Sequence, residues 1–302
     1  MVWLKLEPKH ESTKYFPLEI VSLDMNLKFQ KTRIPERKLI RKSPFSVLYY
    51  NFNDHLLLDT YPAKMPDQLA NDMVLMYSEP GDIVLDPLCG SGTTLREAIR
   101  EGRKAIGIDI NKLAIDLCYQ DPLISKAELQ VADARHTGLE ENSVNLIVTS
   151  PPYGTIIAGK KIAYSDNKED LSNARDYDEF RAMLKDCLKE MLRVLKPGCM
   201  LAINVKSRNK VLLRPLPAYI MVDAIEIGFW PWAWAVLPTH PYMIWTFGDE
   251  KHRKFIPAHE DLLLFRKPDP KVKLKEEDDR LVVKVDGNGG NGSSLEEWLT
   301  DN

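Results

Sequence analysis

The feature that most constrains the fold is a regular alternation of short apolar runs with amphipathic segments, which begins near residue 66. Runs such as DIVLD (82–86), KAIGID (104–109) and NLIVTS (145–150) are typical of strands buried on both faces. Between them lie segments with apolar residues at helical spacing, such as TTLREAIREG (93–102). A chain that repeats strand and helix in this way predicts βαβ units and a mostly parallel sheet.

We predict an α/β, Rossmann-like fold with about seven strands, which is the number of strand-like runs along the chain. The last two strands, WAWAVL (232–237) and DLLLFRK (261–267), are close enough to pair as an antiparallel hairpin. A chain of 302 residues suits one such domain with appendages. We place the domain at 55–268, after a basic N-terminal arm at 1–54 and before an acidic tail at 269–302. The tail contains the linker-like run GNGGNGSS, so we predict that it is disordered.

The net charge of −3 hides an uneven distribution along the chain. The stretch 28–42 carries seven Lys and Arg residues against one Glu, whereas the tail contains EEDD at 276–279. Such a basic run is more often a solvated face than a binding site. We predict that the arm contacts the phosphates of a nucleic acid through Lys28, Lys31, Arg33, Arg37 and Lys38.

Composition also limits the compartment and the kind of site. The N-terminus carries charges throughout and no apolar run approaches the roughly 20 residues of a membrane span, so neither a signal peptide nor a membrane partner is predicted. The cysteines are scattered without metal-ligand spacing, which predicts reduced thiols, a cytoplasmic location and no metal site; they are Cys89, Cys118, Cys187 and Cys199.

The first strand–helix turn reads DPLCGSGTT (86–94). Glycines there let the backbone approach a ligand at a helix N-terminus. A dinucleotide fingerprint would require a further glycine where this chain has Leu95, and the Lys-Ser/Thr pair of a P-loop is absent. The acidic Asp86 that opens the loop suits a cationic amine better than a pyrophosphate.

Two more acids follow successive strands. Asp109 in GIDIN (107–111) can accept both hydroxyls of a ribose, and Asp133 in VADAR (131–135) can accept from the amine of an adenine. Any one of these acids alone is explained as a helix cap. Three acids at the ends of three successive strands predict a site for a nucleoside that bears an amino-acid group.

A rigid corner follows the fourth strand, in TSPPYGT (149–155). Two consecutive prolines remove two N–H donors and fix two φ angles, and they push Ser150 out of helical conformation. The corner therefore presents a hydroxyl, free carbonyls and the aromatic Tyr153 where open α/β sheets bind ligands. The alternative is an ordinary turn at the end of a strand.

DPLCGSGTT, GIDIN, VADAR and TSPPY together resemble the S-adenosylmethionine-dependent amino-methyltransferases, in the branch that methylates cytosine at N4. The resemblance covers residues 55–268 and implies the class I methyltransferase fold. Adenine-N6 and guanine-N2 relatives usually carry Asp or Asn before the PPY, so Ser150 indicates cytosine. The residues implied to bind the cofactor are Thr60, Asp86, Leu88, Cys89, Gly90, Gly92, Thr93, Asp109, Ile110, Asp133 and Ala134.

The resemblance implies catalytic roles for Ser150, Pro151, Pro152 and Tyr153. The Ser150 hydroxyl and the Pro151 carbonyl would accept the two protons of the target amine, which frees its lone pair for the methyl group. The prolines hold these acceptors in place. Tyr153 would stack on the extruded base, which contributes roughly 1–3 kcal/mol.

Restriction-type relatives usually append a target-recognition domain, and no candidate segment is evident here. We therefore expect structured RNA, such as ribosomal RNA, as substrate, recognised by shape. The alternatives are a DNA (cytosine-N4)-methyltransferase, an adenine-N6 or protein-amide methyltransferase, and a binding module without catalysis. Further phosphate contacts are expected from Lys160, Lys161, Lys206 and Arg208.

Trp230, Trp232 and Trp234 lie at strand spacing, and we expect them to pack in the core, with base stacking as the alternative.

Overall fold

The computed structural model describes residues 65–152, 165–209, 213–238 and 259–277, with short strand segments at 248–249, 254–255 and 280–285. The chain divides into two compact units, Met1–Arg33 and Ile34–Asn302, and every described element belongs to the second. The basic arm predicted at 1–54 lies outside the described residues, so its boundary and its role stay predictions.

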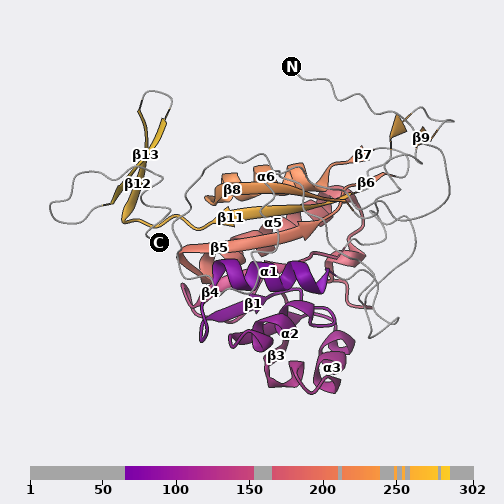
Figure 1. Cartoon of the computed structure of the whole chain (residues 1–302). Helices are drawn as coiled ribbons and strands as arrows, with labels where there is room; N and C mark the ends of the chain where they lie inside the picture. The colour runs from indigo at the N-terminus through magenta and orange to yellow at the C-terminus, as the bar shows by residue number, and fades with distance from the viewer. Residues whose placement is uncertain are drawn as a thin grey trace, which may run out of the picture. The chain divides into compact units, whose positions relative to one another are not determined.

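A sheet of seven strands forms the centre of the fold, in the order β3-β2-β1-β4-β5-β11-β8 (Figure 1). Its first five strands in chain order pair in parallel, and β11 is antiparallel to both β5 and β8. This confirms the predicted α/β, Rossmann-like methyltransferase fold with its antiparallel C-terminal pair. The strands are β1 (Ile83–Asp86), β2 (Lys104–Asp109), β3 (Glu128–Val131), β4 (Val144–Thr149), β5 (Leu195–Val205), β8 (Trp230–Pro238) and β11 (His259–Arg266).

Helices cover both faces of the sheet, as parallel sheets require. Leu85 and Ile147 belong to a core shared with α5 and α6, whereas Val84 and Val148 belong to a second core shared with α1, α2 and α3. Successive side chains of a strand point to opposite faces, so central strands with two covered faces are apolar throughout. The helices are α1 (Asp67–Tyr77), α2 (Thr93–Arg100), α3 (Lys112–Gln120), α5 (Tyr177–Val194) and α6 (Leu216–Ile227), with 3-10 turns at Ile124–Lys126 and Leu171–Asn173.

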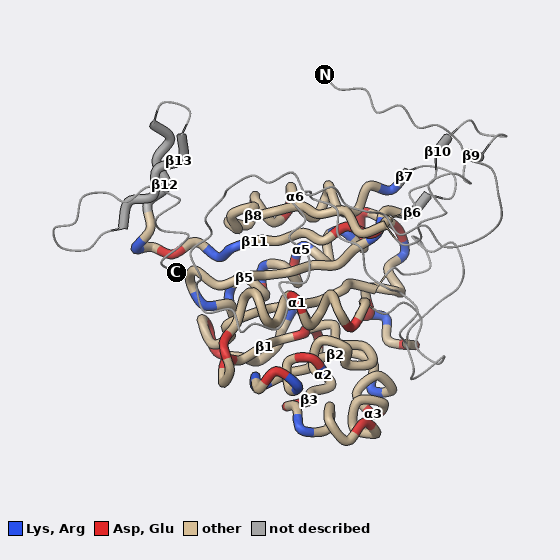
Figure 2. Tube along the Cα trace, in the orientation of Figure 1, with Lys and Arg blue, Asp and Glu red and all other residues tan. Residues whose placement is uncertain are grey.

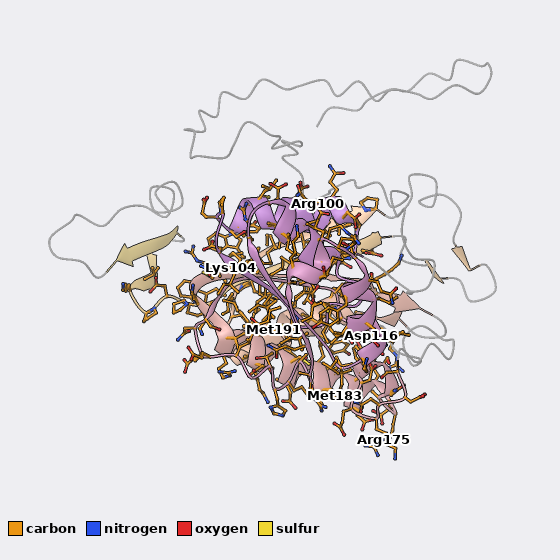
Figure 3. All side chains as sticks on the ribbon, turned by 90° about the horizontal axis from the view of Figure 1, so that it is seen from below. Arg100, Lys104, Asp116, Arg175, Met183 and Met191 are labelled. Carbon is orange, nitrogen blue, oxygen red and sulfur yellow. The ribbon has the colours of Figure 1, made fainter. Side chains whose placement is uncertain are left out.

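Helix α5 shows how local sequence and packing agree. Its N-cap is Asp176, whose carboxylate accepts from the backbone N–H of Glu179 at 2.8 Å. Its apolar stripe includes Phe180 and Met191, each 1% exposed, and such burial stabilises the fold by roughly 1.5–3 kcal/mol per side chain. Figure 3 shows Met191 inside the body of side chains and Arg175 at its rim.

Charged residues gather on helices, loops and strand ends, as Figure 2 shows, and the central strand β4 (VNLIVT) carries none. Within the described part of the chain, no helix has the length and apolar content to cross a membrane. The same residues contain no cluster of His, Cys, Asp or Glu arranged to hold a metal ion.

Part of the C-terminal tail differs from the predicted disorder. Strands β12 (Val272–Glu277) and β13 (Arg280–Val285) form an antiparallel pair in which Val272 lies opposite Val285. The prediction gave weight to the net charge and the glycine-rich run and overlooked the alternation of Val and Leu with Lys in VKLK, which is a strand signal. Four other short strands were also not predicted. They form two antiparallel pairs: β6 (Arg208–Asn209) with β7 (Leu213–Arg214), and β9 (Gly248–Asp249) with β10 (Lys254–Phe255).

The expectation that the tryptophans pack in the core is wrong for two of them. Trp232 is 37% exposed and Trp234 is 41% exposed, because β8 is the edge strand of the sheet. The indole N–H of Trp234 donates to Asp261 Oδ1 at 2.8 Å, and the Arg266 guanidinium lies 5.2 Å from the ring centroid of Trp232. Each of these two tryptophans therefore contacts a charged side chain of the neighbouring strand β11.

The first prediction concerns Gly107, which lies in β2 opposite Asp86 of β1. A Cβ atom there would lie 2.4 Å from Leu95 Cδ1 and 3.1 Å from Leu129 Cδ2. We expect Gly107→Ala to lower the free energy of unfolding by about 1–3 kcal/mol, because Leu95 is fully buried and cannot move freely. Chemical denaturation measures this loss.

Gly138→Asn is the matched control. Gly138 has φ +73° with no atom within 4 Å of a Cβ, and asparagine tolerates this left-handed conformation. The control should change the free energy of unfolding by less than about 1 kcal/mol. An equal or greater loss in the control would contradict the packing explanation.

Candidate active site at the carboxyl edge of the sheet

Polar side chains gather where the parallel strands end. Asp86 ends β1, Asp109 ends β2 and Ser150 follows β4. In open α/β sheets, ligands bind outside the carboxyl ends of the strands, where the strand order reverses. Here the order reverses between β1 and β4, which are neighbours in the sheet. The predicted cofactor residues and the proline corner therefore meet at one edge.

The glycine loop after β1 requires its glycines. Gly90 has φ +50° and Gly92 has φ +82°, in the left-handed region that favours glycine. A Cβ on Gly92 would lie 2.9 Å from Ile124 Cδ1 and 3.0 Å from Cys118 Sγ. The backbone N–H of Cys89 donates to the carbonyl of Ile108 at 2.9 Å, which ties the loop to β2.

Asp109 joins this loop to the start of α3. Its Oδ2 accepts from the N–H of Gly90 at 2.9 Å, and its Oδ1 accepts from the N–H of Asn111 at 2.8 Å. The residue is 8% exposed; burial raises the pKa of Asp109 to about 6, and the two backbone hydrogen bonds lower it. A carboxylate has about four acceptor sites, so two remain for hydroxyl donors of a ligand.

Asp86 is a second buried acid beside the same loop. Burial raises its pKa to about 6, the hydroxyls of Thr149 and Thr94 lower it, and the charge of Asp109 raises it further. Within the described ranges, neither Asp86 nor Asp109 forms an ion pair with Lys or Arg. A buried carboxylate without a cation is unfavourable, so an ammonium group on a ligand would fit here.

Asp133 has a different environment from the other two acids. The Arg135 guanidinium reaches it through Nε at 3.0 Å and Nη2 at 2.5 Å, and also reaches Glu169 Oε2 at 2.6 Å. Burial raises the pKa of Asp133, but the bonds from Arg135 outweigh burial and hold it below the usual value. The sequence prediction missed Arg135, although the spacing D-A-R would have indicated it. The adenine contact of Asp133 stays a prediction.

The proline corner continues directly from β4. Ser150 and Pro152 are half-buried, Pro151 is buried, and Tyr153 lies outside the described residues. Thr149 pairs with Ile203 of β5, so Ser150 and Asn204 are the next residues of two neighbouring strands. The corner therefore sits between the glycine loop and the end of β5.

Asn204 and Glu260 form a contact that the sequence prediction did not include. Asn204 is 2% exposed, and its Nδ2 donates to Glu260 Oε2 at 2.8 Å. Its Oδ1 is buried without a hydrogen-bond partner among the residues that the structure describes. An asparagine inside the apolar run LAINV was the available signal.

The remaining predicted residues divide into three groups. Leu88 and Ile110 are half-buried, and Cys89, Thr93 and Ala134 are buried, all at or next to the glycine loop or the ends of β2 and β3. Lys206 follows β5 and Arg208 begins β6. The predicted residues that lie outside the described ranges are Lys28, Lys31, Arg33, Arg37, Lys38, Thr60, Lys160 and Lys161.

A protein-family model described as DNA methylase matches residues 4–120 and 144–295, which include the glycine loop and the proline corner. The chain belongs to the N6/N4 DNA methylase family. This is a family of S-adenosylmethionine-dependent methyltransferases, so the predicted cofactor is confirmed at the level of the family. The branch within the family, which we predicted as cytosine-N4, is not identified by the match.

Parts of this chain match two curated relatives. The DNA adenine methyltransferase YhdJ of Escherichia coli (strain K12) is 52% identical over 58 residues, which are 18% of this chain and 20% of that protein. The tRNA (guanine(10)-N2)-dimethyltransferase of Methanothermobacter thermautotrophicus is 39% identical over 98 residues, which are 31% of this chain and 29% of that protein. The chain thus matches less than a third of the length of either relative.

A solved structure that resembles the chain is a TehB-like SAM-dependent methyltransferase from Corynebacterium glutamicum. It has 17% sequence identity and a TM-score of 0.43, with 66% of this chain and 86% of that chain covered.

The second prediction uses the raised pKa values of Asp86 and Asp109. We expect the affinity for S-adenosylmethionine to fall as the pH drops through about 6, because both carboxylates must be ionised to attract the ligand's ammonium and accept from its hydroxyls. The loss should be roughly tenfold per pH unit for each such carboxyl. Calorimetry between about pH 5 and about pH 8 measures it.

The same two groups should change the stability of the ligand-free protein in the opposite direction. Their folded pKa values of about 6 lie above the unfolded value of 3.8, so the ionised forms cost stability. That cost disappears as the pH falls from about 6 towards about 4. Asp109→Asn should bind the cofactor weakly, and its cofactor affinity should depend less on pH than that of the wild-type protein. An unchanged pH profile of the affinity in this variant would contradict the role of Asp109 in cofactor binding.

Proposed function

We propose that this protein transfers the methyl group of S-adenosylmethionine to the exocyclic N4 amine of cytosine in nucleic acid. Membership of the N6/N4 DNA methylase family supports the general reaction. The observation that carries the finer proposal is Ser150, which begins the proline corner beside the buried acids of the glycine loop. A serine offers a neutral hydroxyl acceptor where adenine- and guanine-directed relatives usually carry Asp or Asn.

The residues present fit the cofactor. Asp86 is buried and has no Lys or Arg partner among the described residues, so it is suited to the ammonium of the methionine part. Asp109 keeps acceptor sites for the ribose hydroxyls. Bound S-adenosylmethionine supplies a methyl group on a positively charged sulfur. The left-handed Gly90 and Gly92 allow the loop backbone to lie close to such a ligand.

The proline corner then acts on the base. The amine of cytosine is a weak nucleophile because its lone pair is delocalised into the ring. Hydrogen bonds from its two protons to Ser150 Oγ and the Pro151 carbonyl favour a tetrahedral nitrogen with an available lone pair. Pro151 and Pro152 fix these acceptors before the base arrives, so they need little reorganisation during the reaction. Tyr153 stacks on the base, as we propose from its place in the motif.

Structured RNA, such as ribosomal RNA, is the substrate that we favour. An RNA loop presents an unpaired base, whereas a DNA duplex must lose stacking and pairing worth a few kcal/mol before its base enters a site. The similarity to a tRNA (guanine(10)-N2)-dimethyltransferase supports an RNA substrate. The second candidate is a DNA (cytosine-N4)-methyltransferase, which the family description and the similarity to YhdJ support.

The third prediction tests the proline corner. Ser150→Ala should lower turnover by more than about tenfold without changing the affinity for the cofactor, because the hydroxyl acts on the base. Single-turnover methyl transfer and calorimetry measure the two effects. The matched control is Ser125→Ala, because Ser125 is exposed on the 3-10 turn Ile124–Lys126. Full activity in the Ser150→Ala variant would contradict a catalytic role of Ser150 and favour the alternative that the proline corner is an ordinary turn.

The fourth prediction tests the substrate and the base. Purified protein with labelled S-adenosylmethionine should methylate ribosomal RNA or its precursor particle to near one site per molecule and leave mixed-sequence duplex DNA nearly unlabelled. Mass spectrometry of the digested nucleosides should show N4-methylcytidine. Site-specific N4-methylcytosine in the DNA with none in the RNA would establish the DNA candidate, and N6-methyladenine would overturn the choice of base.

A further inference from the structure

Asn204 contains a buried acceptor that the fold leaves unused. The residue is 2% exposed, and its Oδ1 has no hydrogen-bond partner within the described residues. Such an oxygen is unfavourable, because it loses its hydrogen bonds to water and gains none in return. The strand around it is apolar, and its neighbours Ile203 and Val205 are fully buried. An apolar side chain would avoid this cost, so the asparagine is better explained by function than by stability.

Glu260 fixes which way the amide of Asn204 faces. Asn204 Nδ2 donates to Glu260 Oε2 at 2.8 Å. A carboxylate only accepts hydrogen bonds, so the amide turns its NH2 group toward Glu260 and its oxygen away from β11. The contact also makes that oxygen a stronger acceptor, because linked hydrogen bonds polarise one another. The pair therefore holds a directed acceptor at the carboxyl end of β5.

The end of β4 places a hydroxyl beside this acceptor. Figure 1 shows β4, β5 and β11 side by side, with β5 in the middle. Val148 is in register with Ala202, and both belong to the core shared with α1, α2 and α3. Ser150 and Asn204 come two residues later on each strand, so alternation places them on the same face. Neighbouring strands lie roughly 4.7–4.9 Å apart, a gap that serine and asparagine side chains close together.

The hydroxyl of Ser150 requires an acceptor of this kind. A hydroxyl has one hydrogen to donate and two lone pairs that accept. In the proposed reaction a lone pair of Ser150 Oγ receives a proton of the target amine, so the hydroxyl hydrogen must point elsewhere. Among the described residues, no other side chain or carbonyl accepts that hydrogen. A hydroxyl whose hydrogen turned toward the amine would repel it.

We propose that Asn204 is a positioning residue for methyl transfer: its Oδ1 accepts the O–H of Ser150, so that the serine oxygen presents its lone pairs to the target amine. This inference rests on the proposed function and adds the Asn204–Glu260 pair to the same site. Rotation of the serine side chain between staggered positions brings its hydroxyl to Oδ1. Because Oδ1 is buried, Asn204 acts through Ser150, and no covalent bond is made or broken at the amide.

The first variant is Asn204→Leu in the full chain, which keeps the number of side-chain heavy atoms and removes the acceptor. Single-turnover transfer from labelled S-adenosylmethionine to ribosomal RNA and to mixed-sequence duplex DNA measures its rate. The rate on the substrate that the wild-type protein methylates should fall roughly tenfold, with unchanged cofactor affinity by calorimetry. The melting temperature should stay the same or rise, because a buried unsatisfied oxygen is removed.

Asn145→Leu is the matched control. Asn145 lies near the amino end of β4, and its Oδ1 accepts from the N–H of Ile83 at 3.2 Å and from Lys196 Nζ at 2.8 Å. Because this oxygen is satisfied, its removal should lower the melting temperature and leave turnover at the wild-type level. The two asparagines are therefore expected to give opposite results.

A double-mutant cycle with Ser150→Ala shows whether Asn204 acts through the serine. Once the hydroxyl is absent, Asn204→Leu has nothing left to orient, so it should lower the rate by less than about twofold in that background. A purely structural role would instead multiply the two losses. Asn204→Ala, which adds no atoms to the site, goes through the same cycle in case the leucine is too bulky to fold.

The outcomes separate this inference from the proposed function. Multiplied losses in the cycle, or wild-type turnover in both Asn204 variants, would overturn the inference, and so would a lower melting temperature that accounts for the loss in Asn204→Leu. N6-methyladenine as the wild-type product would contradict the choice of cytosine, and the cycle on that substrate would still decide the role of Asn204. Full activity in Ser150→Ala would overturn both proposals.

Discussion

The site depends on the two hydrogen bonds that the Asp109 carboxylate accepts from the backbone N–H groups of Gly90 and Asn111. One bond holds the glycine loop that follows β1, and the other holds the turn that starts α3. A single side chain at the end of β2 thus fixes two loops from different βαβ units. Because Asp109 is 8% exposed, these bonds form away from bulk water, where losing them leaves polar groups unsatisfied.

Burial has opposite consequences for the acids of this fold, depending on their partners. Asp223 is 3% exposed and Asp86 is 4% exposed. Asp223 has Arg181 and Lys185 beside it, so its pKa lies below the usual value and it acts as part of the α5–α6 contact. Asp86 has hydroxyl neighbours instead, and its pKa rises to about 6. An acid that stays buried without a cation is unfavourable for stability, and such groups concentrate at functional sites.

The same reasoning applies with the sign reversed to the basic residues. Carboxylates of the fold accept hydrogen bonds from Arg181 and Arg135, whereas the Arg214 guanidinium lies over the ring of Tyr177. Among the described residues, the buried acids Asp86 and Asp109 have no Lys or Arg partner, and both lie at the carboxyl edge of the sheet. These acids end β1 and β2, which are neighbours in the sheet.

The sequence by itself determined the order of strands and helices, the glycine loop with Asp86 and Asp109, and the proline corner at Ser150. These features are local: the period of apolar residues, the φ preferences of glycine and proline, and an acid at the end of a strand can all be recognised within about ten residues. The strand signal in VKLK was equally local, and the prediction of a disordered tail overlooked it.

Only the tertiary structure decided which charged and polar groups have partners. Glu169 joins Arg135 and Asp133 across 34 residues of sequence, and Asn204 meets Glu260 across 56. The exposure of Trp234 follows from the place of β8 at the sheet edge, which the order of elements along the chain does not give. Contacts between distant residues depend on strand order and register, and a shift of one residue exchanges the faces of a strand. The local sequence therefore specifies the elements, while their packing specifies the electrostatics of the site.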